Sequence, residues 1–263
     1  MIGIFDSGIG GLTVARALTD QLPGYDMVYF GDTAHSPCGN KSLKTITDHA
    51  LRASNFLLEK SVKLMLIASH TTSAAASASL AEKINIPIFE PITPAAESAI
   101  RVSKKFGIGV IGTQATIDSG VYEKRIHGLA PDARVCSVAC PLLVPLLEEG
   151  WVKKPETRMI VKKYLHPLKS RQIDTLVLGC SHYPILKKII QNKIGKRVRV
   201  VDASLALAEA VKGFLEAHPE IDTQMQREGV SRFFVSDLTE QVRQNAKLVF
   251  GKNVRIEDVE FGE

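Results

Sequence analysis

The residues of this 263-residue chain that are best suited to chemistry come directly after short apolar runs. Cys180, Ser181 and His182 follow the run at 175–179. A cysteine thiol has a reference pKa of about 8.5, and it becomes a working thiolate beside a histidine or at a helix N-terminus. In parallel α/β sheets, ligands bind at the carboxyl ends of strands, which is where these residues stand. We therefore predict an acid–base role for Cys180 and His182 rather than a buried thiol and a structural imidazole.

A second polar group follows the apolar run at 63–68. Four hydroxyl residues surround His70 there: Ser69, Thr71, Thr72 and Ser73. Taken singly, each hydroxyl is typical of a helix cap. Together they indicate a polar site, in which His70 and Ser69 are a candidate pair of base and hydroxyl. Adjacent residues on an extended chain point to opposite faces, which weighs against direct contact between the two.

The first apolar run, at 2–5, ends in Asp6, Ser7 and Gly8. Asp and Ser at this place either cap a helix or contribute to a site, and we weigh the two interpretations equally. Gly8, Gly10 and Gly11 do not have the spacing of a dinucleotide-binding fingerprint. Their backbone amides are nevertheless suited to holding an anionic carboxylate.

These polar groups require an α/β framework to position them. Apolar or β-branched runs alternate with helical patterns, which predicts strands between helices. The runs are nearly continuous in apolar character, as expected for mostly parallel sheets covered on both faces, and their number favours two such sheets. The runs are 2–5, 27–30, 63–68, 86–89, 108–112, 134–138, 175–179, 198–201 and 232–236.

A domain boundary is expected where Pro91 and Pro94 interrupt this pattern. A long helix should follow at 94–105. A second break lies near 201–204, before a helix at 205–217 and the last apolar run. We expect one α/β domain of residues 1–93 plus 205–263, and a second, similar domain of residues 94–204.

Composition excludes several classes of protein. Lys and Arg number 33 against 28 Asp and Glu, and the surplus of +5 forms no basic stripe, so a nucleic acid is not expected as the primary partner. No apolar run approaches the roughly 20 residues of a membrane span. Four scattered cysteines and the absence of a signal-peptide pattern predict a cytoplasmic protein with reduced thiols. Cys136 and Cys140 lack a second ligand pair, which argues against a metal site.

Four segments resemble the motifs of cofactor-independent aspartate/glutamate racemases, and of the glutamate racemases among them. They are 4–13 (IFDSGIGGLT), 29–34 (YFGDTA), 140–150 (CPLLVPLLEEG) and 178–184 (LGCSHYP). The resemblance implies two α/β domains with the active site in the cleft between them, and a homodimer. It implies a small amino-acid or diacid substrate, with glutamate first, and a role in cell-wall peptidoglycan synthesis. It implies no cofactor, neither PLP nor a metal.

The resemblance also implies a mechanism with two bases. One cysteine thiolate removes the α-proton, and a second thiol returns a proton from the opposite face. Cys180 matches the second of these cysteines, which acts on the L enantiomer. Asp6 and His182 are then polar supports of the thiols, with Glu148 near His182. A further set of residues would hold the amino and carboxylate groups of the substrate: Ser7, Pro37, Cys38, Gly39, Thr71, Thr72 and Ser181.

The chain departs from this family pattern at three positions. Ser69 stands where the first catalytic cysteine of Ala-Cys-Asn-Thr is expected, Cys38 replaces the tyrosine of Pro-Tyr-Gly, and His35 stands where arginine is common. A hydroxyl is a weaker acid than a thiol by several pKa units, and each unit corresponds to about 1.4 kcal/mol. Ser69 is therefore a poor general base. It can still bind substrate or relay a proton through His70, and an engineered Cys→Ser change is a third explanation for the serine.

Three functions remain open at this point. The first is an amino-acid racemase in which Ser69, assisted by His70, takes the place of one base. The second is a decarboxylase or isomerase of a small diacid, in which Cys180 alone protonates one face and the hydroxyls of 69–73 hold a carboxylate. The third is a binding or regulatory protein that has kept the cleft and lost turnover. We rank it last, because Asp6, Glu148, Cys180 and His182 are all present.

Overall fold

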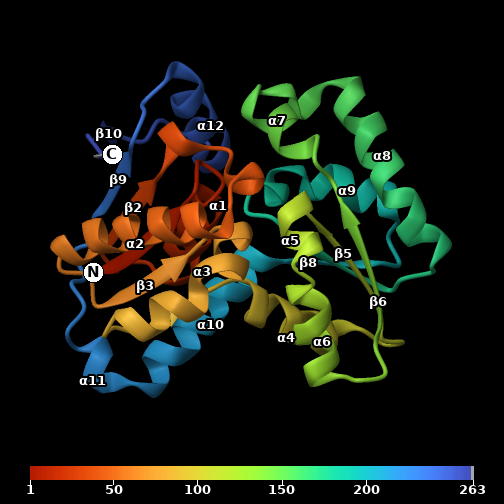
Figure 1. Cartoon of the computed structure of the whole chain (residues 1–263), viewed down its shortest axis with the longest axis horizontal. Helices are drawn as coiled ribbons and strands as arrows, with labels where there is room; N and C mark the ends of the chain where they lie inside the picture. Colours follow the sequence, from red (N-terminus) through yellow and green to blue (C-terminus); the bar gives the residue numbers. More distant parts are fainter. Residues whose placement is uncertain (262–263) are drawn as a thin grey trace.

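The structure is a computed structural model that describes residues 1–261. Within this part of the chain, two parallel β-sheets lie side by side, and helices cover both (Figure 1). One sheet has six strands in the order β10-β9-β2-β1-β3-β4, and the other has four in the order β6-β5-β7-β8. Every strand pair is parallel. The predicted α/β class with two mostly parallel sheets is confirmed.

The six-stranded sheet takes its strands from both ends of the chain: β1 (Ile2–Asp6), β2 (Met27–Gly31), β3 (Leu64–Ile67), β4 (Ile88–Phe89), β9 (Ser231–Val235) and β10 (Ile256–Asp258). The four-stranded sheet consists of β5 (Gly107–Gly112), β6 (Arg134–Ala139), β7 (Thr175–Gly179) and β8 (Arg199–Asp202). The apolar runs predict all of these strands except β10. This short edge strand pairs only with β9, and two of its three residues are charged.

The helices divide between the two sheets. Those that pack near the six-stranded sheet are α1 (Leu12–Gln21), α2 (Leu43–Glu59), α3 (His70–Lys83), α10 (Ala203–Ala217), α11 (Pro219–Asp222) and α12 (Glu240–Phe250). Those near the four-stranded sheet are α4 (Ile92–Val102), α5 (Gln114–Asp118), α6 (Val121–Leu129), α7 (Leu143–Glu148), α8 (Pro155–Ser170) and α9 (Lys187–Ile194). Short 3₁₀ turns lie in the connections: η1 (Thr33–His35), η2 (Cys38–Asn40), η3 (Trp151–Lys153) and η4 (Tyr183–Leu186).

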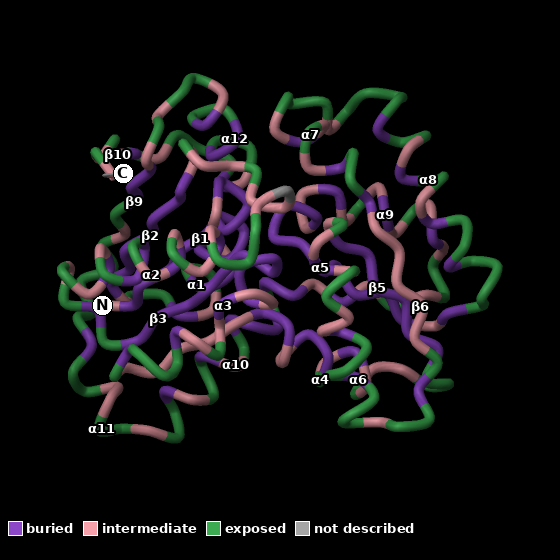
Figure 2. The backbone as a smooth tube through the Cα atoms, in the orientation of Figure 1, coloured by how far each residue is buried: buried purple, intermediate pink, exposed green. Residues whose placement is uncertain are grey.

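The central strands are buried on both faces, as their continuous apolar sequences predict. Ile4 of β1 packs into the core shared with α1 and α10, whereas the next residue, Phe5, packs into the core shared with α2 and α3. Successive side chains of a strand point to opposite faces, so one strand supplies both cores. Figure 2 shows this arrangement, with buried backbone along the strands and exposed backbone on the outer helices. Each fully buried side chain of this size contributes about 1.5 to 3 kcal/mol.

Two helices begin earlier than predicted, because acidic side chains accept hydrogen bonds from their first backbone N–H groups. The Glu90 carboxylate accepts from Ile92 at 2.6 Å and from Thr93 at 2.9 Å, so α4 spans Ile92–Val102 rather than 94–105. Pro94 falls in the first turn, where a missing N–H costs nothing. Asp202 accepts from the N–H of Ser204 at 3.1 Å, so α10 begins at Ala203 rather than at 205.

The last part of the chain packs beside the first. β9 pairs with β2, and α10 and α12 contact α1 (Figure 1). Two links, one before α4 and one between β8 and α10, therefore connect the two sheets. None of the helices in residues 1–261 combines the length and the apolar character that a membrane crossing requires.

Candidate active site

A cavity of about 400 Å³ lies between the two sheets. Segments that follow β1, β2 and β3 form one wall, and segments that follow β5, β6 and β7 form the other. The cavity thus stands at the carboxyl ends of the parallel strands, where a ligand site is expected. All but one of the predicted site residues line it: Asp6, Ser7, Pro37, Cys38, Gly39, Ser69, His70, Thr71, Glu148, Cys180, Ser181 and His182. The exception is Thr72.

Cys180, His182 and Glu148 form a hydrogen-bonded chain on the second wall. Cys180 Sγ lies 3.9 Å from His182 Nδ1, and His182 Nε2 lies 3.1 Å from Glu148 Oε1. Burial alone would lower the pKa of His182, but the hydrogen bonds with Cys180 and Glu148 and the charges of these two groups raise it well above its usual value. A protonated His182 places a positive charge beside Cys180 Sγ.

Asp6 is buried between the two walls. Its Oδ1 accepts a hydrogen bond from the backbone N–H of Gly8 at 3.0 Å, and its Oδ2 accepts one from the Ser181 hydroxyl at 3.1 Å. Burial raises the pKa of Asp6. The N–H of Gly8 therefore binds a side-chain carboxylate of the protein itself.

Ser69, Ser7 and Cys38 form a hydrogen-bonded row on the first wall. Ser69 Oγ lies 3.0 Å from Ser7 Oγ, and the Cys38 thiol donates to Ser7 Oγ at 3.0 Å. Ser69 is also the N-cap of α3, because its Oγ accepts from the backbone N–H of Thr72 at 3.3 Å. Thr72 thus supports Ser69 through its backbone. Thr72 lines a smaller cavity that shares Asp6, Ser7 and Cys38 with the first one.

His70 is 3% exposed, and within residues 1–261 neither of its ring nitrogens has a hydrogen-bond partner. Its ring stacks on that of Tyr122, with the centroids 6.1 Å apart. Burial lowers the pKa of His70 to about 3, so the imidazole is neutral at physiological pH. The hydrogen bonds of Ser69 Oγ go to Ser7 and Thr72 instead of His70. The geometry does not support the predicted pairing of base and hydroxyl.

Three threonine hydroxyls connect the walls. Thr71 Oγ1 lies 3.0 Å from Thr113 Oγ1 and 3.2 Å from Thr116 Oγ1, and the latter two are 2.9 Å apart. Thr113 was not predicted, although it follows the apolar run at 108–112 in the same way that Ser69 follows its own run. The expectation that ligands bind at the carboxyl ends of strands would have identified Thr113. Other cavity residues that were not predicted are Ser36, Gln114, Cys140, Pro141, Val144, Pro145 and Glu149.

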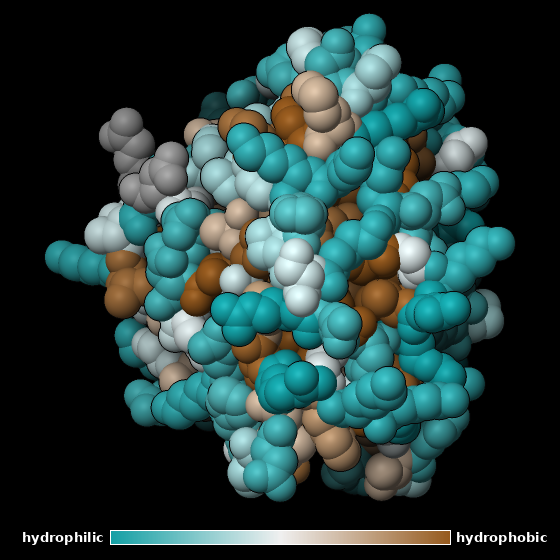
Figure 3. All heavy atoms as spheres, turned by 90° about the vertical axis from the view of Figure 1, so that its right-hand side faces the viewer, coloured by the Kyte–Doolittle hydropathy of each residue, from teal (hydrophilic) through white to brown (hydrophobic). Residues whose placement is uncertain are grey.

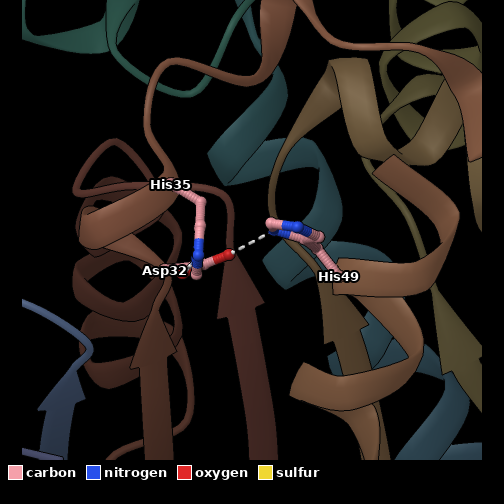
Figure 4. Close-up of side chains that lie close together, drawn as sticks. All are labelled: Asp32, His35 and His49. Carbon is pink, nitrogen blue, oxygen red and sulfur yellow. Dashed lines mark hydrogen bonds and ion pairs between the residues drawn. The ribbon is translucent and has the colours of Figure 1, made fainter. Parts of the chain in front are cut away.

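Asp32, His35 and His49 gather beside the segment that carries Cys38 (Figure 4). Asp32 Oδ1 lies 2.7 Å from His35 Nδ1, and Asp32 Oδ2 lies 3.0 Å from His49 Nδ1. Ser236 donates a third hydrogen bond to the carboxylate at 2.9 Å. Their side-chain types could ligate a metal, but the carboxylate already has three partners within the protein. These bonds tie the start of the Cys38 segment to β2, β9 and α2.

The chain matches the family model described as Asp/Glu/Hydantoin racemase over residues 12–211. A protein named glutamate racemase from Syntrophus aciditrophicus is 41% identical over 253 residues, which are 96% of this chain and 93% of that protein. The solved structure of glutamate racemase isoform RacE1 from Bacillus anthracis has a TM-score of 0.92 at 34% identity, covering 98% of this chain and 97% of that one. Another, from Francisella tularensis in complex with D-glutamate, has a TM-score of 0.89 at 35% identity, covering 99% and 97%.

The family match spans most of the chain, and the resemblance of the four sequence motifs agrees with it. In the cavity, a thiol within hydrogen-bond distance of a histidine stands opposite a second polar wall. The chain therefore belongs to the Asp/Glu/hydantoin racemase family of isomerases.

Proposed function

We propose that this chain interconverts L- and D-glutamate without a cofactor, by moving the α-proton between the two faces of the substrate in the cavity between the sheets. The observation that carries the proposal is the hydrogen-bonded chain of Cys180, His182 and Glu148, which opens onto this cavity. The same cavity is lined on the opposite wall by Ser7, Cys38 and Ser69. A proton can then be taken from one side of Cα and returned from the other.

In this mechanism Cys180 is the base on one face. Its thiolate, stabilised by protonated His182, removes the α-proton of L-glutamate, and the electron pair delocalises into the substrate carboxylate. A group on the first wall then donates a proton to the opposite face of Cα. Ser69, with or without His70, is the sequence-based candidate for this group. Its hydrogen bonds to Ser7 and Thr72 give it no activating base.

The polar residues around the cavity are suited to the other groups of the substrate. We propose that the hydroxyls of Ser7, Thr71 and Ser181 and the backbone near Gly39 hold the α-amino and α-carboxylate groups. Glutamate is the preferred substrate in this proposal, because the relatives named above are glutamate racemases and one of them was solved with D-glutamate. The cavity volume of about 400 Å³ lies in the range of small-molecule sites.

Proton NMR in D₂O, with L- and D-glutamate in separate samples and a chiral assay on each, tests this function. We expect the α-proton signal to disappear in both samples and the enantiomers to interconvert. Cys180→Ser should abolish interconversion. Cys136→Ser is the matched control, because Cys136 lies on β6 and is not among the residues that line the cavity. If neither enantiomer loses its α-proton signal, the proposed function is refuted.

We also propose a homodimer that works in the cytoplasm. Large hydrophobic side chains are exposed in the half of the molecule that carries the four-stranded sheet, at Leu142, Trp151 and Met159. Figure 3, which looks onto this side, shows hydrophobic groups among a mainly hydrophilic surface. All four cysteines are free thiols, which suits a reducing compartment. Light scattering coupled to size-exclusion chromatography would reveal the dimer, and a monomer at micromolar concentration would refute it.

A further inference from the structure

We propose that Cys38 supplies the second acid–base group of the site and that its thiol exchanges the α-proton on the face opposite to Cys180. This inference rests on the proposed racemisation and names the residue that completes it. The resemblance to the racemase motifs implies a thiol at position 69, where the chain has the hydroxyl of Ser69, and the chain carries a thiol, Cys38, at a different position on the same wall.

Ser69 is poorly placed for proton transfer. Its Oγ caps α3 by accepting the N–H of Thr72, and it pairs with the hydroxyl of Ser7. No carboxylate or imidazole is among these partners, so no group lowers the cost of forming an alkoxide. An unactivated hydroxyl is several pKa units too weak as an acid to exchange protons efficiently at neutral pH.

Cys38 lies beside Ser69, and its thiol interacts with the hydroxyls of Ser7, Ser69 and Thr71. Its Sγ is 3.0 Å from Ser7 Oγ, and Ser7 Oγ is in turn 3.0 Å from Ser69 Oγ. Cys38 belongs to η2, which follows β2 of the six-stranded sheet, whereas Cys180 follows β7 of the four-stranded sheet. Both residues line the cavity. The two thiols therefore approach a ligand from opposite walls.

Cys140 is the other cysteine that lines the cavity, and it fits the role less well. It follows β6 and so belongs to the same wall as Cys180. Its thiol is directed to the carbonyl oxygen of Val138 at 3.6 Å. A proton donor on this wall cannot reach the face of the substrate that points away from Cys180.

The proposed step balances without any further reactant. In the direction from L- to D-glutamate, the Cys180 thiolate takes the α-proton: the C–H bond breaks, an S–H bond forms, and the electron pair stays on the substrate. The Cys38 thiol then gives its proton to Cα from the other side, leaving a Cys38 thiolate. Burial raises the pKa of Cys38, which favours the thiol in the resting site. The hydroxyl of Ser7 can donate to the thiolate formed in the step.

The test uses the full chain in D₂O with each glutamate enantiomer, and compares Cys38→Ser, Cys180→Ser, Ser69→Ala and the control Cys136→Ser. Cys38→Ser should slow interconversion about 100- to 10,000-fold, the usual contribution of a general acid or base. It should still exchange the α-proton of the one enantiomer that Cys180 serves. Cys180→Ser should show the reciprocal pattern, with exchange from the other enantiomer only. Ser69→Ala should cost about tenfold or less, the value of a neutral hydrogen bond.

Two results would overturn the role of Cys38 and leave the racemase function intact. One is a Cys38→Ser variant that interconverts the enantiomers within tenfold of the unmodified protein. The other is a variant that loses exchange from both enantiomers equally, which would indicate a structural role. An unmodified protein that exchanges neither enantiomer would refute the racemase function itself, and the role of Cys38 with it. Circular dichroism of each variant confirms that it is folded.

Discussion

Replacing His70 by Gln should make the stability of the protein much less sensitive to acid. His70 is 3% exposed, and burial lowers its pKa to about 3 from the reference value of 6.5. Below pH 6.5 the unfolded chain binds a proton at this residue, whereas the folded protein does not until the pH nears 3. The free energy of unfolding therefore falls as the pH drops through this window.

The magnitude follows from the size of the window. At pH 4.5, two units below the reference pKa, the single site costs about 2 to 3 kcal/mol relative to pH 7.5, at about 1.4 kcal/mol per unit. Urea unfolding of the parent and of His70→Gln at both pH values measures the effect. The parent should lose about 2 to 3 kcal/mol more than the variant. His166→Gln, at an exposed position of α8, is the control that should follow the parent.

A parallel loss of stability in the parent and in His70→Gln would refute this reasoning. It would mean that the buried imidazole accepts a proton in the folded state, for example from a group that moves to meet it. His70 would then be available as a base, and the case against its partnership with Ser69 would fail.

Two further substitutions test the second wall of the site. Glu148→Gln removes the charged partner of His182 and should lower the pKa of His182. The alkaline limb of the pH profile of kcat/KM should then move to lower pH. The activity should fall about 10- to 100-fold, which corresponds to the loss of a hydrogen bond to a charged group. An unchanged limb would show that Glu148 does not tune His182. Gly10→Ala would bring a methyl group within 2.5 Å of Ser181 Oγ and closer still to the His182 ring, so this variant should lose its activity. Gly213→Ala is the control and should stay active, because the added methyl group meets open space. A fully active Gly10→Ala protein would contradict the packing described here.

Much of the fold follows from local patterns that the sequence displays directly. The apolar runs lie at nine strands because parallel strands covered on both faces must be apolar along their whole length. β10 escapes this rule, because it is an edge strand with Glu257 and Asp258 in a three-residue element. The earlier starts of α4 and α10 depend on side-chain caps from Glu90 and Asp202, which a pattern of prolines and apolar residues does not reveal.

The site is partly predictable for the same reason. Residues after strands converge on one cavity, so Cys180, Ser69 and Asp6 were found from position alone. Contacts between segments that are distant in the sequence could not be found in this way. The Cys38 thiol meets Ser7 across 31 residues, a pairing that only the folded backbone brings about. His70 was assigned to Ser69 by adjacency, whereas the turn into α3 directs its ring against Tyr122.

The most direct test of the account is the isotopic content of the first product molecules. L-glutamate with protium at Cα is incubated with the protein in D₂O, and D-glutamate formed in the first few per cent of the reaction is separated and analysed by mass spectrometry. Because separate groups on opposite walls remove and return the proton, essentially every product molecule should carry deuterium at Cα, in this direction and in the reverse one. Product that retains the original protium would show that one group both removes and returns the proton, and would contradict the account.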